Sequence, residues 1–209
     1  MTKKIMFSDR FGLTDAVRDG RKKMTRRRAY DGEIKDIHTG YITEGVDAGR
    51  LALCDGNMIV AKSKYKLGEV VAVAQRYCEV WNDPFVSEQC LADEQEPDFL
   101  RYEKGWNNKM FVKAAYMPHR IRITDIKVER LQDISDEDCL KEGIYVSDTF
   151  TKYGLHNGYS PQCANDPKEK KRWFHSPKEA FAALIDKVSG KGTWERNDWQ
   201  FAYTFKLIK

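Results

Sequence analysis

The C-terminal segment holds the clearest strand pattern in the chain. Its aromatic and apolar side chains alternate with polar ones, so that one face of an extended segment carries Trp199, Phe201, Tyr203, Phe205 and Leu207. The other face carries Gln200, Thr204 and Lys206. This alternation predicts a strand with one face in the core.

Three further segments favour strands. Within 120–131, Ile121 and Ile123 stand at odd positions, and Ile126 and Val128 stand at even positions. These two pairs would face opposite sides of a regular strand, so the pattern predicts a strand with a β-bulge near Asp125. The short apolar runs 58–61 and 70–74 follow turn residues, and their continuous apolar character predicts strands buried on both faces.

Helices are expected at three places with start or stop signals. A short helix over 13–19 would end at Gly20. Ser135 precedes three acidic residues and a later glycine, Gly143, which predicts a capped helix between them. Ser176, with Pro177 and Glu179 behind it, forms a capping box ahead of an amphipathic run.

These elements predict an α+β fold in which strands dominate and the helices are short and separated. No regular strand–helix alternation is present, so a small, mostly antiparallel β-barrel with flanking helices fits better than a doubly wound sheet. The 209 residues suit one domain over 1–209 with long loop insertions at about 28–65, 82–109 and 145–173.

Composition restricts the class of protein. Hydrophobic residues make up 41% and charged residues 33%, a balance typical of folded chains. No apolar run approaches the roughly 18 residues that span a bilayer, and the first residues are charged, so we expect a cytoplasmic protein without a membrane segment. The five cysteines form no C-x-x-C pair and the four histidines are scattered, so neither a metal nor a cofactor is expected.

The charge is unevenly distributed although the net value is only +4. Basic residues crowd the segment 18–28, and acidic ones crowd 79–103. A basic cluster of this density suits phosphate neutralisation, although a run of charges is also typical of a solvated surface.

The segment 20–27, GRKKMTRR, resembles the G-x-K-x-x-x-x-R signature of the ASCH domain family through Gly20, Lys22 and Arg27. Segments 65–71, 121–144 and 194–205 are similar to further blocks of that family in the same order, the last to the closing strand of larger stand-alone ASCH proteins of phages and prophages. Together the blocks cover roughly half of the chain, and their order makes the resemblance more specific than any single block.

This resemblance implies a PUA-like β-barrel of five to six strands that binds RNA or a modified nucleoside. Small bacterial members of the family hydrolyse N4-acetylcytidine with a lysine and a threonine of the signature and a glutamate of a later helix. The matching positions here are Lys22, Thr25 and Glu142. The remaining cations of the segment become candidate ligand-binding residues: Arg21, Lys23, Arg26 and Arg27.

The proposed roles are chemically consistent. A threonine hydroxyl becomes nucleophilic when a neighbouring base takes its proton, and a lysine with a lowered pKa can do so. Glu142 would stand at the negative end of a helix, which disfavours a second negative charge and suits a general acid.

Two other functions fit the same residues: a non-catalytic RNA-binding module and a metal-independent ribonuclease. The chain also departs from the family pattern. Val73–Arg76 stands where many relatives carry an Arg-Glu pair, Lys23 stands where threonine is frequent, and the chain is about twice as long as the small amidohydrolases. The family's ligand contacts are therefore carried over only at the matching positions.

Overall fold

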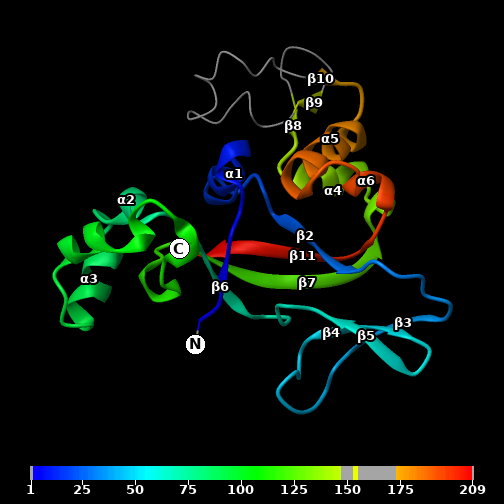
Figure 1. The fold of residues 1–209 in the computed structure, drawn as a ribbon, viewed down its shortest axis with the longest axis horizontal. Coiled ribbons are helices and arrows are strands. Elements are labelled where there is room, and N and C mark those ends of the chain that lie inside the picture. Colours follow the sequence, from blue (N-terminus) through cyan, green and yellow to red (C-terminus); the bar gives the residue numbers. More distant parts are fainter. Residues whose placement is uncertain (1, 147–152, 155–172, 209) are drawn as a thin grey trace.

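The computed structural model describes residues 2–146, 153–154 and 173–208. At its centre lies a five-stranded sheet (Figure 1). In spatial order its strands are β1 (Lys4–Ile5), β6 (Val70–Val73), β7 (Arg120–Arg130), β11 (Trp199–Ile208) and β2 (Met24–Tyr30). Only the β1–β6 pair is parallel, so the sheet is mostly antiparallel, as expected.

Two smaller sheets complete the β-structure. One consists of β3 (Ile37–Tyr41), β4 (Leu51–Asp55) and β5 (Met58–Lys62), and the other of β8 (Tyr145–Val146), β9 (Tyr153–Gly154) and β10 (Trp173–Phe174). The segment 28–65, which we expected to be a loop insertion, thus contributes a sheet. The prediction that 58–61 is buried on both faces is wrong, because Met58 and Ile59 are exposed; β6 is largely buried.

The central sheet is open along two edges. Among the strands that the structure describes, β2 pairs only with β11, and β1 pairs only with β6. No pairing between the described strands closes the sheet, so the fold is α+β, and the closed barrel remains a prediction.

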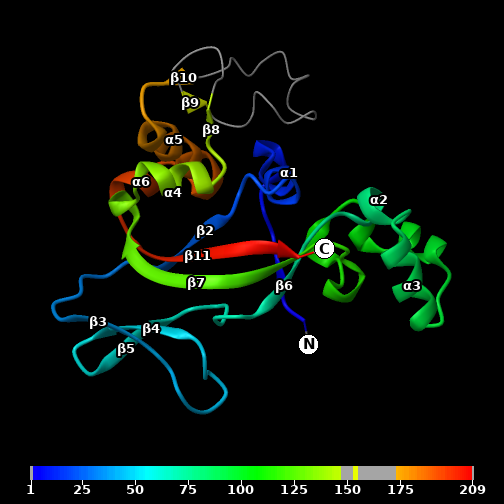
Figure 2. The same cartoon turned by 180° about the vertical axis from the view of Figure 1, so that it is seen from behind.

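Helices cover one side of the central sheet, and β3–β5 lie on the other (Figures 1 and 2). The covering helices are α1 (Leu13–Arg18), α4 (Asp136–Lys141), α5 (Pro177–Ser189) and α6 (Thr193–Arg196). Within the described ranges, no helix has the length and apolar character needed to cross a membrane.

Segment 77–117 forms a helical extension with a core of its own. It holds α2 (Tyr77–Val80), α3 (Pro84–Ala92) and four 3₁₀ turns: Pro97–Tyr102, Lys104–Trp106, Lys109–Phe111 and Ala114–Tyr116. Two other 3₁₀ turns, Asp9–Phe11 and Leu131–Asp133, precede α1 and α4. The expected insertion 82–109 is therefore mostly helical, whereas most of 145–173 lies outside the described residues.

The predicted helix caps are confirmed. The Ser135 hydroxyl accepts a hydrogen bond from the Asp138 N–H at 3.1 Å, and the Ser176 hydroxyl accepts one from the Glu179 N–H at 3.1 Å. Each bond satisfies one backbone donor that the first turn of a helix leaves unpaired. These caps fix the start of α4, which leads to Glu142, and of α5, which covers the site described below.

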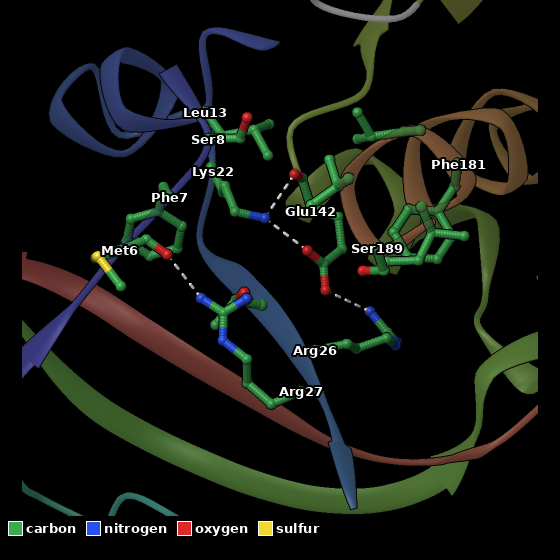
Figure 3. A pocket seen from close by; sticks show the side chains of 14 residues that line it. Met6, Phe7, Ser8, Leu13, Lys22, Arg26, Arg27, Glu142, Phe181 and Ser189 are labelled. Atoms are coloured by element: carbon green, nitrogen blue, oxygen red, sulfur yellow. Dashed lines mark hydrogen bonds and ion pairs between the residues drawn. The ribbon is translucent and has the colours of Figure 1, made fainter. Parts of the chain in front are cut away.

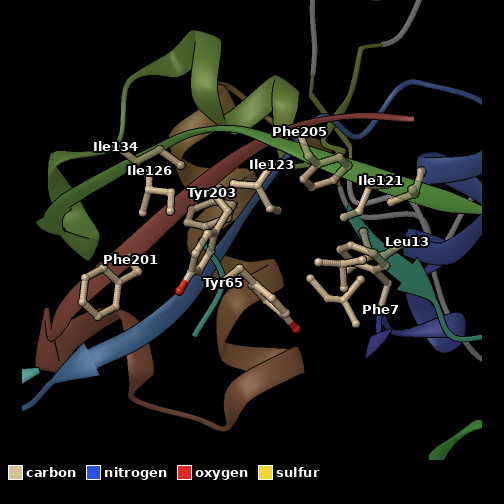
Figure 4. Packing of buried hydrophobic residues seen from close by; sticks show 14 of the residues in the cluster. Phe7, Leu13, Tyr65, Ile121, Ile123, Ile126, Ile134, Phe201, Tyr203 and Phe205 are labelled. Carbon is tan, nitrogen blue, oxygen red and sulfur yellow. The ribbon is translucent and has the colours of Figure 1, made fainter. Parts of the chain in front are cut away.

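The strand pattern is confirmed in the core. Phe201, Tyr203 and Phe205 are buried together between the sheets (Figure 4). The pairing register of β7 and β11 shifts between Thr204 and Phe205, which leaves one extra residue in β7 and restores its apolar face. The expected bulge near Asp125 is thus present.

Candidate functional site

Lys22 enters the protein interior at the start of β2. Gly20 adopts a left-handed backbone with φ 72° at the end of α1, and the Lys22 N–H donates to the Ala16 carbonyl at 2.8 Å. This turn directs the Lys22 side chain inward, where it is buried, while its neighbours Arg21 and Lys23 face solvent. The alternation follows from the extended backbone that leads into β2.

Glu142 receives the lysine at the end of α4. The Lys22 Nζ donates to the Glu142 carboxylate at 2.5 Å and to the Glu142 backbone carbonyl at 2.7 Å (Figure 3). That carbonyl is one of those left without a helical partner at a C-terminus, where a cation is favourable. Gly143 follows with φ 100° and packs its backbone against the Lys22 stem, where a side chain would be strained.

Arg26 holds the other oxygen of the same carboxylate. Its Nη1 lies 3.0 Å from the Glu142 Oε1, and its Nε donates to Glu129 at 3.0 Å. Asp138 stands 3.6 Å from the guanidinium and 2.5 Å from Lys127. Two buried cations therefore share one buried carboxylate, and two further acids balance Arg26.

Burial sets the protonation chemistry of the two cations. Loss of solvent lowers the pKa of the Lys22 amine from its ordinary 10.5, because it outweighs the opposing charge and hydrogen bond of Glu142. For Arg26, burial acts in the same direction, but the charges of Glu142 and Glu129 outweigh it and raise the pKa of the guanidinium. Lys22 is therefore the member of the cluster suited to losing a proton, and Arg26 remains a fixed positive charge.

A cavity of about 80 Å³ opens beside this cluster. It lies where the β1 and β2 edges of the central sheet approach one another, and the Arg27 Nη2 spans that gap by donating to the Met6 carbonyl at 2.9 Å (Figure 3). Phe7 lies under both Lys22 and Arg27, with its ring centre 5.7 Å from the amine. The remaining walls come from α5 through Phe181, Leu184, Ile185, Val188 and Ser189.

The structure brings five of the predicted residues together. Lys22, Thr25, Arg26, Arg27 and Glu142 all line this cavity. Arg21 and Lys23 do not line it, because strand alternation turns them to solvent, where Arg21 contacts Asp19 at 2.9 Å. They can meet only a ligand that extends over the surface.

The surroundings of Glu142 differ from the expectation. We expected the helix end to dominate its environment; instead, both carboxylate oxygens accept hydrogen bonds from cations. In the contact between the Lys22 Nζ and the Glu142 Oε2, which are 2.5 Å apart, the amine is the donor of the hydrogen bond. A general-acid role requires the donated proton to move onto the carboxylate.

Three contributors to the site were not predicted: Glu129, Asp138 and Phe7. The first two lie on β7 and α4 and face Arg26, and Phe7 follows β1. Glu129 shares one face of the predicted strand with Asp125 and Lys127, but its link to Arg26 depends on the register β7–β11–β2, in which Lys127, Ala202 and Arg26 align. A single sequence carries no local signal for that register.

Other chemistry near the cavity is limited. Cys139 precedes Glu142 on α4, but burial raises the pKa of its thiol to about 12, so it does not form a nucleophilic thiolate at neutral pH. Within the described part of the chain, no group of three histidine, cysteine or acidic residues is arranged to hold a metal ion. Cys163 and His156 lie outside the described residues.

Comparison of the chain with protein-family models, with curated proteins and with solved structures finds no match.

Proposed function

We propose that this protein is an ASCH-type amidohydrolase that removes the acyl group from N4-acylated cytidine. The observation that carries the proposal is the buried Lys22 amine, 2.5 Å from the Glu142 carboxylate, in a cavity that Thr25 also lines. A base, a hydroxyl and a proton-holding carboxylate are the three groups that amide hydrolysis through a covalent intermediate needs.

The first half of the reaction uses the proton that Lys22 donates to Glu142. Moving it from Nζ to Oε2 gives a neutral amine beside a carboxyl group, and burial, which lowers the pKa of Lys22, favours the loss of the proton from the amine. The amine then takes the Thr25 proton while Oγ1 attacks the acyl carbonyl carbon. The bond from that carbon to cytosine N4 breaks, and the carboxyl proton passes to the departing amino group.

The second half regenerates the enzyme. Water attacks the acyl-threonine ester and transfers a proton to the carboxylate, and the Thr25 oxygen regains the proton held by Lys22. The sum is amide plus water giving cytidine and a carboxylic acid, so atoms and protons balance. Arg26 stays charged throughout and holds Glu142 in place, which makes it a positioning residue.

The size of the cavity limits which part of the substrate enters. The volume of about 80 Å³ is far below the ~300 Å³ or more of sites that enclose a whole ligand. An acyl group and the edge of the base fit this volume. The ribose must therefore lie outside, toward the open edge of β2.

The PUA-like barrel is part of the same proposal. It is supported by Arg27, whose side chain joins the two edge strands at the point where a barrel would close. The burial of Lys22 favours a catalytic role over phosphate binding, because an amine that neutralises a ligand's phosphate needs access to solvent.

A non-catalytic RNA-binding module is the second candidate, favoured by the exposed side chains of Arg21, Lys23 and Arg28 on one segment. It predicts RNA affinity that falls steeply with salt and no release of cytidine. Shortened RNA would instead indicate the ribonuclease expected as a third possibility.

The test is the pH dependence of cytidine release from N4-acetylcytidine. The mechanism needs one proton on the Lys22–Glu142 pair to protonate the departing amino group, and above the Lys22 pKa that proton is lost. We therefore expect kcat to fall with rising pH along one limb whose midpoint lies below 10.5, the ordinary lysine value. Product formation is followed by chromatography from about pH 6 to about pH 10, a range chosen to fall below the ordinary lysine pKa.

Lys22→Met removes the base and should lower kcat by about 10²-fold or more at every pH. Lys23→Met, one position along and exposed, is the matched control and should leave the profile unchanged. A flat profile, or full activity in Lys22→Met, would contradict the role of Lys22. No release of cytidine at any pH would remove the amidohydrolase proposal and leave the RNA-binding module.

A further inference from the structure

A second cavity of about 210 Å³ adjoins the first along the free edge of β2. The two share four lining residues: Arg26, Arg27, Ile185 and Ser189. The second is completed by Arg28 at the far end of the segment and by Thr193, Arg196 and Gln200. The shared walls make the two cavities neighbouring parts of one groove between the β2 edge and helices α5 and α6.

Two arginines supply the charge of the second cavity. The Arg28 and Arg196 side chains are 58% and 49% exposed, which contrasts with the buried Arg26. Both guanidiniums approach one buried carboxylate, that of Asp198, at 3.8 Å and 3.4 Å. Arg28 also lies 3.6 Å from the exposed Asp31. One buried acid thus anchors two cations that line the groove, and Arg27, which lines both cavities, adds a third cation.

A neutral donor stands beside these cations. Ser189 lines the cavity with a hydroxyl, whereas the Thr193 hydroxyl donates its proton to the Gly190 carbonyl at 2.6 Å and accepts a hydrogen bond from the Arg196 Nη2 at 3.1 Å. This contact orients the guanidinium within the wall.

The backbone of β2 adds donors to the same edge. The Phe205 N–H donates to the Lys23 carbonyl at 2.9 Å. Antiparallel pairing alternates along a strand, so the Thr25 and Arg27 backbone groups face β11, and those of Arg26 and Arg28 face the groove. Guanidinium forks, hydroxyls and backbone N–H groups are together the donor set that binds phosphate oxygens.

We infer that the second cavity binds a phosphate group of the substrate. This inference rests on the proposed function: with the acyl group and base edge in the first cavity, the ribose lies toward the β2 edge and carries its phosphate between Arg28 and Arg196. The substrate class is then a phosphorylated N4-acylcytidine, either a free nucleotide or a residue of an RNA chain, rather than a free nucleoside.

The test compares binding of cytidine and cytidine 5′-monophosphate by titration calorimetry, which does not depend on turnover. We expect the nucleotide to bind about tenfold more tightly, and Arg28→Gln to reduce this preference by about threefold or more. Arg122→Gln, an exposed arginine on β7 away from both cavities, is the matched control and should keep the full preference.

Arg28→Gln leaves Asp198 paired with Arg196, and thermal unfolding checks that the variant is folded. Arg196→Gln, measured in the same way, should lower the preference as well. Equal affinity for the two ligands, no measurable binding of the nucleotide, or an unchanged preference in both variants would overturn the inference.

The source of the phosphate is decided by a cytidine-containing trinucleotide. Tighter binding of the trinucleotide than of the mononucleotide identifies RNA, and equal binding identifies a free nucleotide. Failure of the proposed function gives a different result: the phosphate preference persists while no acylated cytidine, with or without phosphate, is hydrolysed.

Discussion

Thr25→Val should abolish release of cytidine from N4-acetylcytidine, with a loss in kcat on the order of 10⁴-fold or more. Thr25 is buried in β2, opposite Tyr203, and lines the cavity beside Lys22 and Glu142. Valine keeps the branched shape and the strand preference of threonine but has no hydroxyl. The loss therefore reports on the nucleophile rather than on packing, and it is measured by steady-state chromatography of the product.

Thr25→Ser restores a hydroxyl at the same position and should recover a measurable part of the activity. Thr39→Val, in the exposed strand β3, is the matched control and should behave as the unaltered protein. Activity within tenfold of the original in Thr25→Val would assign the attack to another group, such as a water molecule activated by Lys22.

Glu142→Ala should lower the free energy of unfolding by about 3–5 kcal/mol. The substitution leaves the Lys22 amine and the Arg26 guanidinium buried without the carboxylate that both contact, at 2.5 Å and 3.0 Å. An uncompensated buried charge is among the most destabilising changes that a single substitution makes. Urea unfolding followed by far-UV circular dichroism measures the difference.

Glu137→Ala is the matched control for this loss. Glu137 lies on the same helix, α4, but its side chain is 78% exposed and forms an ion pair with the partly exposed Lys141, at 2.9 Å. An ion pair of this kind contributes about 0.5 kcal/mol or less. Equal effects of the two substitutions would show that the buried cluster contributes no more than an ordinary surface pair.

The elements that were predictable carry their signals locally. The caps of Ser135 and Ser176 and the apolar face of β11 depend on residues close together in the chain. Even the bulge in β7 follows from the change of parity between Ile123 and Ile126. These features are fixed by backbone hydrogen bonding and by side-chain alternation, which a sequence displays directly.

The features that were not predicted depend on contacts between distant segments. β3 reads IHTGY, is exposed throughout and contains a glycine, so no apolar alternation marks it as a strand. β2 was not expected either, because its three consecutive arginines are typical of a solvated segment, whereas Met24, Thr25 and Arg26 are all buried. Arg26 is neutralised by Glu129 of β7 and by Glu142 at the end of α4, and these residues lie more than 100 positions from Arg26 in the chain.

The candidate site also combines features that the sequence predicts with features that it does not. The signature residues Lys22, Thr25 and Glu142 are identified by resemblance, and their chemistry follows from residue type. The sequence does not predict the direction in which each side chain points. Alternation along the extended segment separates Lys22, which is buried, from Arg21 and Lys23, which face solvent, so a uniform basic cluster in the sequence becomes two sets of cations with different uses.

The central claim is that Thr25 forms a covalent bond with the acyl group, and the most direct measurement is the mass of the peptide that contains it. The protein is mixed with N4-acetylcytidine, quenched in acid during turnover, digested and analysed by mass spectrometry. The account predicts an added acetyl group on Thr25, absent when cytidine replaces the substrate. Release of cytidine without any acetylated Thr25, at time points that cover the first turnover, would contradict it.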